Sequence, residues 1–192
     1  MSQENSNNKV FVTGHTRGIG KAVCDLFTAK GYQCEGVSTS TGFDVVEDCD
    51  RIVDMMKDFD YIVLNAYKDN SQKNMLKKII KRYQDNNKKV AVITSTSGTP
   101  IGEDPDHDTP TYKKYCQDKK NLMAYIEAIQ QDLFSHPMNI YDVCPDTVKT
   151  DMSDGLWEDW PKLSAEDVAE CVWLCFTSKF NFNRMVVQKH GA

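Results

Sequence analysis

The sequence lacks the features that would place it among nucleic-acid-binding or membrane proteins. Its 192 residues carry a net charge of −5 and a pI of about 5.4, so basic residues are not in excess. A local cluster of cations, Lys77, Lys78, Lys81 and Arg82, is typical of a solvated helix face. No hydrophobic run is long enough to span a bilayer. The polar start, residues 1–9, lacks the apolar core of a secretory signal. We therefore expect a cytoplasmic protein with no nucleic-acid or membrane partner.

The seven cysteines show no Cys-x-x-Cys pair and no spacing typical of metal ligands. Several of them, including Cys144, Cys171 and Cys175, lie within apolar runs. Such cysteines behave as small buried hydrophobes. We expect reduced thiols in a reducing compartment and no bound metal.

Short apolar segments alternate with stretches of helical spacing, without an internal repeat or an interdomain linker. Strands are expected at residues 9–13, 33–38, 61–64, 89–94, 138–143 and 185–188. Helices are expected at residues 18–30, 48–57, 71–83, 112–134 and 164–177. Continuous apolar strands separated by helices are typical of a parallel sheet covered on both faces. The sequence predicts a polar tail at residues 1–8 and one α/β domain with a doubly wound parallel sheet at residues 9–192.

A glycine-rich turn at residues 13–20, with the sequence Thr-Gly-His-Thr-Arg-Gly-Ile-Gly, lies between the first expected strand and the first expected helix. Glycines let a backbone approach a phosphate closely, and a helix N-terminus presents free N–H groups and partial positive charge. A dinucleotide-binding loop requires this context. An ordinary strand-to-helix turn also carries glycines, so the loop alone leaves both interpretations open.

Tyr115 and Lys119 are at positions i and i+4 of an expected helix, so their side chains share one face. A free tyrosine has a pKa of about 10, and a nearby ammonium lowers that pKa by stabilising the phenolate. The pair can then exchange a proton with a carbonyl or an alcohol. Taken alone, the two residues also fit a solvated helix turn.

Together, the glycine turn and the later Tyr-x-x-x-Lys resemble the short-chain dehydrogenase/reductase family. Further resemblances follow in order. Asp44-Val45 resembles the family's adenine-contacting Asp, and Asn65-Ala66-Tyr67 resembles its Asn-Ala-Gly element. Residues 93–98 resemble the strand end that carries the catalytic Ser, residues 144–152 resemble the Pro-Gly segment that closes over the nicotinamide, and residues 164–169 resemble the start of the last core helix. The resemblance implies a Rossmann fold and an NAD(P)-dependent oxidoreductase that reduces a small carbonyl compound or oxidises an alcohol.

The resemblance also implies residue roles. Ser95 would hold the substrate oxygen, Tyr115 would transfer the proton, and Lys119 would in addition bond the nicotinamide ribose. Ser97 shares a strand face with Ser95 and stays a second candidate for the serine role. The implied cofactor contacts are Gly14, Arg17, Gly18, Ile19, Gly20, Ser38, Thr39, Asp44, Asn65, Ala66, Tyr115, Lys119, Pro145, Val148 and Thr150.

The end of the second expected strand indicates the cofactor. NAD enzymes usually carry an Asp or Glu there for the ribose 2′-hydroxyl. Here Ser38 and Thr39 occupy that place, and Glu35 lies earlier in the strand. Arg17 in the glycine turn can meet a 2′-phosphate, or it can simply be exposed to solvent. We expect NADP(H) rather than NAD(H).

The chain also departs from the family pattern. Tyr67 and Asp146 stand where glycines are expected, and residues 150–164 leave little room for a substrate-covering lid. These departures favour an alternative function: a catalytically weak or inactive NADP(H)-binding protein that acts as a sensor or assembly component. The intact Ser95, Tyr115 and Lys119 favour the enzyme, and an epimerase-like member is disfavoured because its substrate domain has no room here.

The sequence also lacks elements that members of the family usually have. A crossover helix before Asp44 is missing, and any third strand is reduced to a stub near Phe43. The Asn that often completes the family's catalytic set has no counterpart, because Asn74 lies too close to Asn65.

Apolar stripes on the expected helices at 71–83 and 112–134 predict a homodimer or homotetramer, since relatives typically pair through these helices. Each stripe could instead cover the sheet. Tyr112, Trp157 and Trp160, with His107 in an acidic loop, could line the mouth of a substrate pocket. Packing is the preferred interpretation for the aromatic residues and solvation for the histidine.

Overall fold

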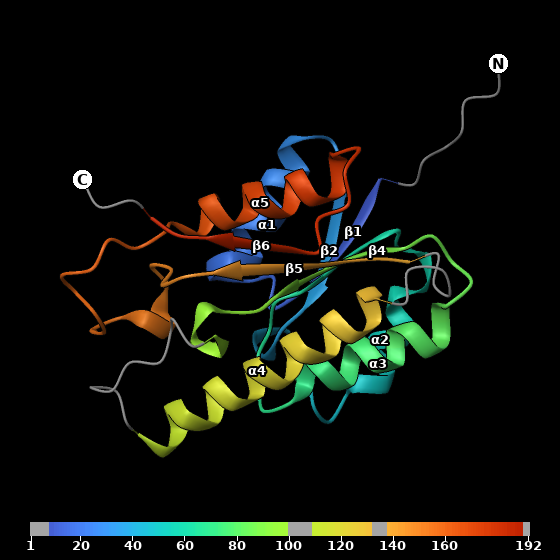
Figure 1. Cartoon of the computed structure of the whole chain (residues 1–192). Helices are drawn as coiled ribbons and strands as arrows, with labels where there is room; N and C mark the ends of the chain where they lie inside the picture. Colours follow the sequence, from blue (N-terminus) through green and yellow to red (C-terminus); the bar gives the residue numbers. More distant parts are fainter. Residues whose placement is uncertain (1–7, 100–108, 132–137, 190–192) are drawn as a thin grey trace.

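Six parallel strands form the centre of the protein. The computed structural model describes residues 8–99, 109–131 and 138–189. The strands are β1 (Lys9–Thr13), β2 (Gln33–Val37), β3 (Tyr61–Leu64), β4 (Lys89–Ile93), β5 (Asn139–Pro145) and β6 (Arg184–Val187). They pair in the order β2-β1-β3-β4-β5-β6, always in parallel (Figure 1). The predicted doubly wound parallel sheet is confirmed.

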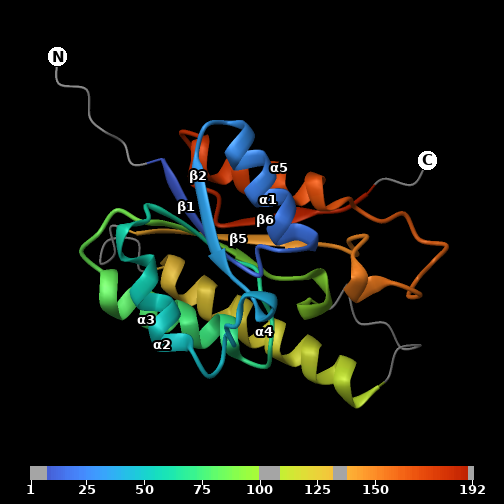
Figure 2. The same ribbon diagram turned by 180° about the vertical axis from the view of Figure 1, so that it is seen from behind.

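Helices cover both faces of this sheet. Helices α1 (Gly18–Ala29) and α5 (Ala165–Thr177) contact each other on one face. Helices α2 (Cys49–Met55), α3 (Ser71–Tyr83) and α4 (Pro110–Gln131) lie on the other face, as Figure 2 shows from behind. Short 3₁₀ turns connect the elements: η1 (Thr39–Thr41), η2 (Met56–Asp58), η3 (Thr96–Gly98) and η5 (Asp151–Ser153).

The strands read as continuous apolar runs because both of their faces are buried. Side chains alternate along a strand, so neighbours point into opposite layers. In β1, Phe11 belongs to the core beneath α2, α3 and α4, whereas Val10 and Val12 belong to the core beneath α1 and α5. All three side chains are at most 1% exposed. Burial on both faces fixes the positions of the strands, and the residues that follow the strand ends form the candidate site.

Element boundaries agree with the sequence analysis to within about two residues where they are described. Residues 132–134 of the expected fourth helix lie outside the described residues, as do residues 1–7 of the expected tail and His107. Helix α5 begins after Ser164, whose hydroxyl accepts a hydrogen bond from the Asp167 amide while the Asp167 carboxylate accepts one from the Ser164 amide. Such reciprocal capping satisfies amides that a helix leaves unpaired at its start.

The sheet begins at β2, because the described residues between β2 and α2 form turns and no strand. A doubly wound sheet of order 3-2-1-4-5-6 carries one more strand beyond this edge. The strand stub expected near Phe43 is therefore wrong. The Phe43 amide donates to the Ser38 carbonyl oxygen at 3.1 Å, and the ring lies beneath the Arg51 guanidinium at 4.7 Å. A tight turn thus replaces both the missing helix and the missing strand.

The cysteine prediction is wrong for one pair. Cys24 of α1 and Cys34 of β2 form a disulfide, with their Cα atoms 5.4 Å apart. Their pairing depends on how α1 packs beside β2, which their spacing in sequence does not reveal. Cys144 and Cys175 are buried as expected, and Cys171 is partly buried. Among the described residues, no cluster of His, Cys, Asp and Glu could hold a metal ion.

None of the helices in the described ranges combines the length and the apolar character that crossing a membrane requires.

Candidate active site

The candidate site lies where β1, β3, β4 and β5 end. Parallel strands end at one edge of a sheet, and ligands of such sheets bind there. Gly14 follows β1, Asn65 follows β3, Ser95 follows β4 and Asp146 follows β5. The fold thus gathers segments that are distant in the sequence.

The glycine turn forms a narrow cradle at the start of α1. Gly14 has a φ of +75°, a conformation that side chains rarely adopt, and its amide donates to the Val37 carbonyl oxygen at 2.7 Å. A Cβ on Gly20 would lie 2.1 Å from the Gly14 carbonyl oxygen. Gly18 is the first residue of α1, and Ile19 packs against the core beneath this helix. The turn therefore brings bare backbone to a helix N-terminus.

Asn65 and Ala66 brace this turn from the neighbouring strand. Their amides both donate to the Thr13 hydroxyl, at 3.0 and 3.1 Å, and the Asn65 side-chain amide donates to the Thr13 carbonyl oxygen at 3.2 Å. In the turn itself, the Nδ1 atom of His15 is buried and has no partner among the described residues. Buried polar atoms rarely stay unpaired. The backbone N–H groups that α1 leaves unpaired at its start, rather than those bonded to Thr13, fit the oxygens of a cofactor phosphate.

A cluster of hydroxyls marks the end of β2. The Thr16 hydroxyl lies 3.2 Å from that of Ser38 and 3.0 Å from that of Ser40, which are 2.8 Å apart from each other. Thr39 is exposed, and the other two hydroxyls of this cluster, those of Thr16 and Ser40, were not named in the sequence analysis. Arg17 is also exposed, with its guanidinium 3.3 Å from the Asp151 carboxylate.

Asp44 is already partnered within the chain. Its carboxylate accepts hydrogen bonds from the Lys68 ammonium and from the amides of Val46 and Glu47. The bond from Lys68, followed by the bond from the Val46 amide, lowers the pKa of Asp44. Next to it, a hollow of about 240 Å³ lies between Val45 and the first turn of α3.

Ser95 and Tyr115 meet at the end of β4. The Ser95 side chain lies close enough to the Tyr115 phenol to lower its pKa, and the Ser95 oxygen accepts the Ser97 amide at 3.2 Å. Ser97, the second candidate, instead accepts a hydrogen bond from the Tyr112 hydroxyl at 3.3 Å. The geometry thus brings Ser95, rather than Ser97, to Tyr115.

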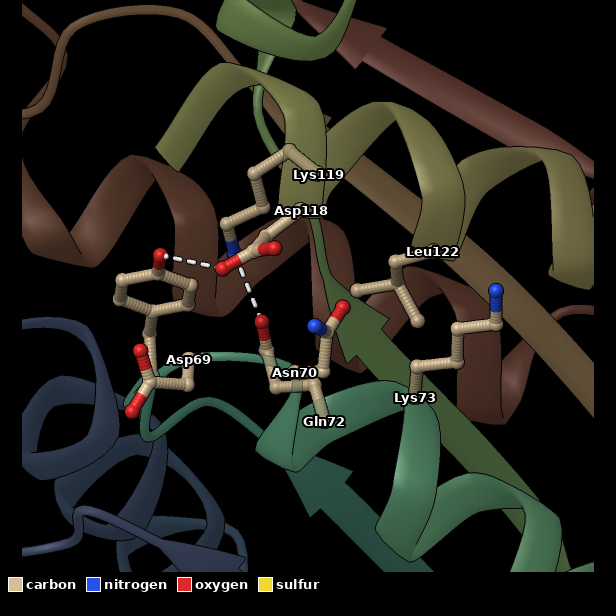
Figure 3. Close-up of a pocket in the computed structure, with 8 residues that line it drawn as sticks. Asp69, Asn70, Gln72, Lys73, Asp118, Lys119 and Leu122 are labelled. Carbon is tan, nitrogen blue, oxygen red and sulfur yellow. Dashed lines mark hydrogen bonds between the residues drawn. The ribbon is translucent and has the colours of Figure 1, made fainter. Parts of the chain in front are cut away.

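Lys119 is buried directly beside this pair. Its ammonium donates to the Gln72 side-chain oxygen at 2.8 Å (Figure 3). It also donates to the Ile93 carbonyl oxygen at 2.9 Å. The same nitrogen lies 5.5 Å from the centre of the Tyr115 ring. All three residues of the predicted catalytic set are therefore neighbours.

Gln72 is a site residue that the sequence analysis missed. Its side-chain nitrogen donates to the carbonyl oxygens of Leu64 and Ile93, at 2.8 and 2.9 Å, and so joins the ends of β3 and β4. A signal was present in the sequence. Gln72 is a polar residue in the apolar stripe that continues, at helical spacing, through Met75, Leu76 and Ile79 of α3.

Burial dominates the electrostatics of this centre. Burial raises the pKa of Tyr115 to about 12, although the interaction with Ser95 lowers this pKa. It lowers the pKa of Lys119 to about 7, although Asp142 opposes this shift. The expectation that Lys119 lowers the pKa of Tyr115 is wrong for this arrangement, because the ammonium faces Gln72 and Ile93 instead of the phenol oxygen. The phenol consequently stays protonated at neutral pH and can donate a proton.

Tyr67, which stands in place of a glycine, covers Lys119. Its ring lies 5.4 Å from the Lys119 ammonium and meets the Tyr115 ring edge-on at 5.0 Å. The Tyr67 hydroxyl donates to the Asp118 carboxylate at 3.0 Å (Figure 3). Lys114 donates to the same carboxylate at 2.9 Å. The hollow between these described side chains has no space for a water molecule.

Two carboxylates, one on β5 and one directly after it, form hydrogen bonds to residues around the site. Asp142 is 1% exposed and accepts hydrogen bonds from Thr94 and from the Arg184 guanidinium. Burial raises the pKa of this carboxyl. Asp146 accepts a hydrogen bond from the Thr96 hydroxyl at 3.1 Å and so ties β5 to the segment after Ser95.

The segment after β5 lies close to the glycine turn. Pro145 is the last residue of β5, and Val148 forms an isolated bridge with Leu163. A Cβ on Gly18 would lie 3.3 Å from the Thr150 methyl group, so these two residues are neighbours. The segment expected to close over a nicotinamide therefore reaches the start of α1.

Known proteins resemble this chain in sequence and in fold. Residues 8–111 match the family model of the short chain dehydrogenases, which confirms the resemblance noted in the sequence. No curated protein matches the sequence. The fold is similar to that of a 3-ketoacyl-(acyl-carrier-protein) reductase from Brucella melitensis complexed with NADH. That structure is 16% identical, with a TM-score of 0.77 over 93% of this chain and 96% of that chain.

Two further structures have the same fold. A short chain dehydrogenase from Burkholderia cenocepacia, in complex with NADP, is 15% identical, with a TM-score of 0.73 over 94% of this chain and 88% of that chain. A short-chain dehydrogenase/reductase from Vibrio parahaemolyticus is 19% identical, with a TM-score of 0.70 over 95% of this chain and 100% of that chain.

The lowered pKa of Lys119 predicts a pH-dependent stability. Its pKa is about 7 in the folded protein, against 10.5 for a free lysine, so between these values the unfolded chain binds more protons. The free energy of unfolding should then rise with pH across this window, by up to about 1.4 kcal/mol per pH unit. Lys119→Met should remove that rise, and the exposed Lys120→Met should keep it. Urea unfolding at pH 7, 8 and 9 measures the three slopes. Equal slopes in all three proteins would contradict the lowered pKa.

Proposed function

Because the chain belongs to the short chain dehydrogenase family, a family of NAD(P)-dependent oxidoreductases, we propose that it uses NADP(H) to reduce a small carbonyl compound or to oxidise the corresponding alcohol. The observation that carries this proposal is the buried Lys119 nitrogen, which is bonded to Gln72 and Ile93 and lies 5.5 Å from the centre of the Tyr115 ring. A solvated helix turn would not bury a lysine in this way.

Three side chains would perform the reduction. The bound cofactor supplies a hydride to the carbonyl carbon. The Ser95 hydroxyl would hydrogen-bond the carbonyl oxygen and stabilise the negative charge that develops on it. Tyr115, protonated at neutral pH, would give its proton to this oxygen and complete the alcohol. The Lys119 ammonium would have to turn from Gln72 toward the phenol oxygen to stabilise the phenolate that remains, and it would bond the nicotinamide ribose.

The cofactor would lie along the edge of the sheet. Its phosphates would meet the glycine turn and the start of α1, where the backbone is bare. Its adenine would lie by Asp44, in the hollow of about 240 Å³ beside Val45. The 2′-phosphate would meet Arg17 and the hydroxyls of Ser38 and its neighbours. The remaining contacts would come from Gly14, Gly18, Ile19, Gly20, Thr39, Asn65, Ala66, Pro145, Val148 and Thr150.

An NADP(H) preference predicts unequal binding of the two reduced cofactors. NADPH should bind more tightly than NADH, because no carboxylate follows β2 and Arg17 is free to exchange its exposed partner Asp151 for a phosphate. Arg17→Ala should narrow the difference by roughly tenfold or more, the scale of a lost charge-assisted contact. Lys21→Ala, which removes a nearby exposed cation of α1, should leave the difference unchanged. Calorimetric titration measures all of these affinities, and equal affinities in the unaltered protein would refute the preference.

The proposed proton donor predicts a separation of turnover from binding. Tyr115→Phe keeps the ring but loses the proton, so NADPH-dependent reduction should fall by about 10²-fold or more. NADPH affinity should survive, because the phenol does not hold the phosphates. Tyr125→Phe, on the same helix, should retain activity. Steady-state rates on a panel of carbonyl compounds provide the measurement.

Two outcomes would overturn the mechanism. Retained activity in Tyr115→Phe would remove Tyr115 from the role of proton donor. Failure of the unaltered protein to consume NADPH with any carbonyl compound would favour the alternative function, an NADP(H)-binding protein without turnover.

An oligomer remains a prediction, as does a cytoplasmic location. Most residues of the two apolar stripes are buried in the chain's own core, and only Ile80, Tyr125 and Ile129 among them are partly buried at its margin. We still expect at least a dimer through α3 and α4. Light scattering at micromolar concentration tests this, and a monomeric mass would contradict it.

A further inference from the structure

Four aromatic side chains form a continuous row that begins at Tyr115. The Tyr115 ring is stacked with Tyr112, with the planes 23° apart and the centres 6.4 Å apart. Tyr112 is followed by Trp157 at 6.0 Å, and Trp157 by Trp160 at 6.2 Å. Ring centres at 4.5–7 Å are typical of favourable aromatic contacts. The row therefore connects the proposed proton donor to a surface further out.

This row starts where the substrate carbonyl would lie and runs away from Lys119. Tyr67 and Lys119 occupy one side of the Tyr115 ring, whereas Tyr112 is stacked on it and anchored to Ser97. The two tryptophans belong to the segment between β5 and α5. In both views this orange segment projects on the same side as the first turn of α4 (Figures 1 and 2).

Packing alone does not explain the outer half of the row. Trp160 is 54% exposed and the nearby Met152 is 67% exposed, whereas a packing anchor would be buried. Trp157 has a φ of +47°, a conformation that is unfavourable for a bulky side chain and that is retained mainly at functional sites. The interpretation of the two tryptophans as packing anchors is therefore replaced by that of a binding platform.

The segment that carries the platform is braced. The Lys162 ammonium donates to the carbonyl oxygens of Ser153 and Leu156, at 3.2 and 2.5 Å. The Ser153 hydroxyl donates to the Val148 carbonyl oxygen at 2.6 Å, and the bridge between Val148 and Leu163 closes the base. The tryptophans are thus held in place before any ligand binds, which lowers the entropic cost of binding one.

Charge on the same segment selects against anions. The segment from residue 150 to residue 163 contains four carboxylates, at Asp151, Asp154, Glu158 and Asp159, and one cation, Lys162. Among the described residues, only Asp151 of these carboxylates is paired with a cation outside the segment, Arg17. This lysine is already bonded to backbone carbonyls. A keto acid or a phosphorylated substrate would be repelled, whereas an uncharged planar ring would stack on the row.

We propose that the substrate is an uncharged aryl ketone or aryl aldehyde, whose ring stacks on the row Tyr112–Trp157–Trp160 while its carbonyl reaches Ser95 and Tyr115. This inference rests on the proposed function. The carbonyl carbon gains the hydride from NADPH, the π pair of the C=O bond moves onto oxygen, and that oxygen takes the Tyr115 proton. The products are the benzylic alcohol and NADP⁺, and the Tyr115 phenolate regains its proton from solvent.

A matched pair of ketones tests this proposal. Acetophenone carries a planar ring, and cyclohexyl methyl ketone carries a saturated ring of the same size. Trp157→Leu should lower kcat/KM for acetophenone roughly three- to tenfold, the scale of one aromatic pair, and leave cyclohexyl methyl ketone unchanged. Trp157→Phe should restore much of the loss. Phe180→Leu, a distant exposed aromatic, should change neither ketone. Because each variant is compared on both ketones, their different intrinsic reactivities cancel.

The outcomes separate this inference from the function on which it rests. Equal losses on both ketones in Trp157→Leu would indicate a structural role and overturn the platform. Turnover of other carbonyl compounds without turnover of acetophenone would overturn the substrate class and leave the reductase function intact. No NADPH consumption with any carbonyl compound would overturn the proposed function, and this inference with it.

Discussion

The buried ammonium of Lys119 is the constraint on which the rest of the site depends. A charge removed from water must find hydrogen-bond partners within the protein, or its burial is prohibitively costly. Here the partners are the Gln72 side chain and the Ile93 carbonyl oxygen, and Gln72 in turn bonds the end of β3. One ammonium thereby joins α3 and α4 to two strand ends. The position of Tyr115, one helical turn earlier, follows from that of Lys119.

Local patterns were sufficient for much of this fold. Strands such as 61–64 were predicted to the residue because two-sided burial demands a continuous apolar run. The neighbourhood of Ser95 and Tyr115 followed from the family resemblance. Contacts that depend on packing between distant elements were not predictable from local patterns. The disulfide between Cys24 and Cys34 and the orientation of the Lys119 ammonium are two such cases, and neither leaves a pattern in the local sequence.

Shortening of the chain has been compensated by polar contacts at the same edge of the sheet. Where a helix and a strand are missing after β2, Asp44 is held by Lys68 and by two backbone amides. Where a glycine is replaced after β5, Asp146 bonds Thr96 across to η3. Where the usual asparagine has no counterpart, Gln72 contacts Lys119. Each contact links an altered segment to a strand end, so the edge stays ordered although the elements around it are fewer.

The surroundings of Tyr115 also bear on the direction of the reaction. Burial raises its pKa to about 12, so the phenol is protonated at neutral pH. If Tyr115 is the proton donor, reduction starts from the form that predominates, whereas oxidation must first form the scarce phenolate. The Lys119 ammonium is the group that could stabilise this phenolate, but it is directed to Gln72 and Ile93. The site as it stands holds Tyr115 in the protonated form that reduction requires, and alcohol oxidation would require the Lys119 ammonium to turn toward the phenol.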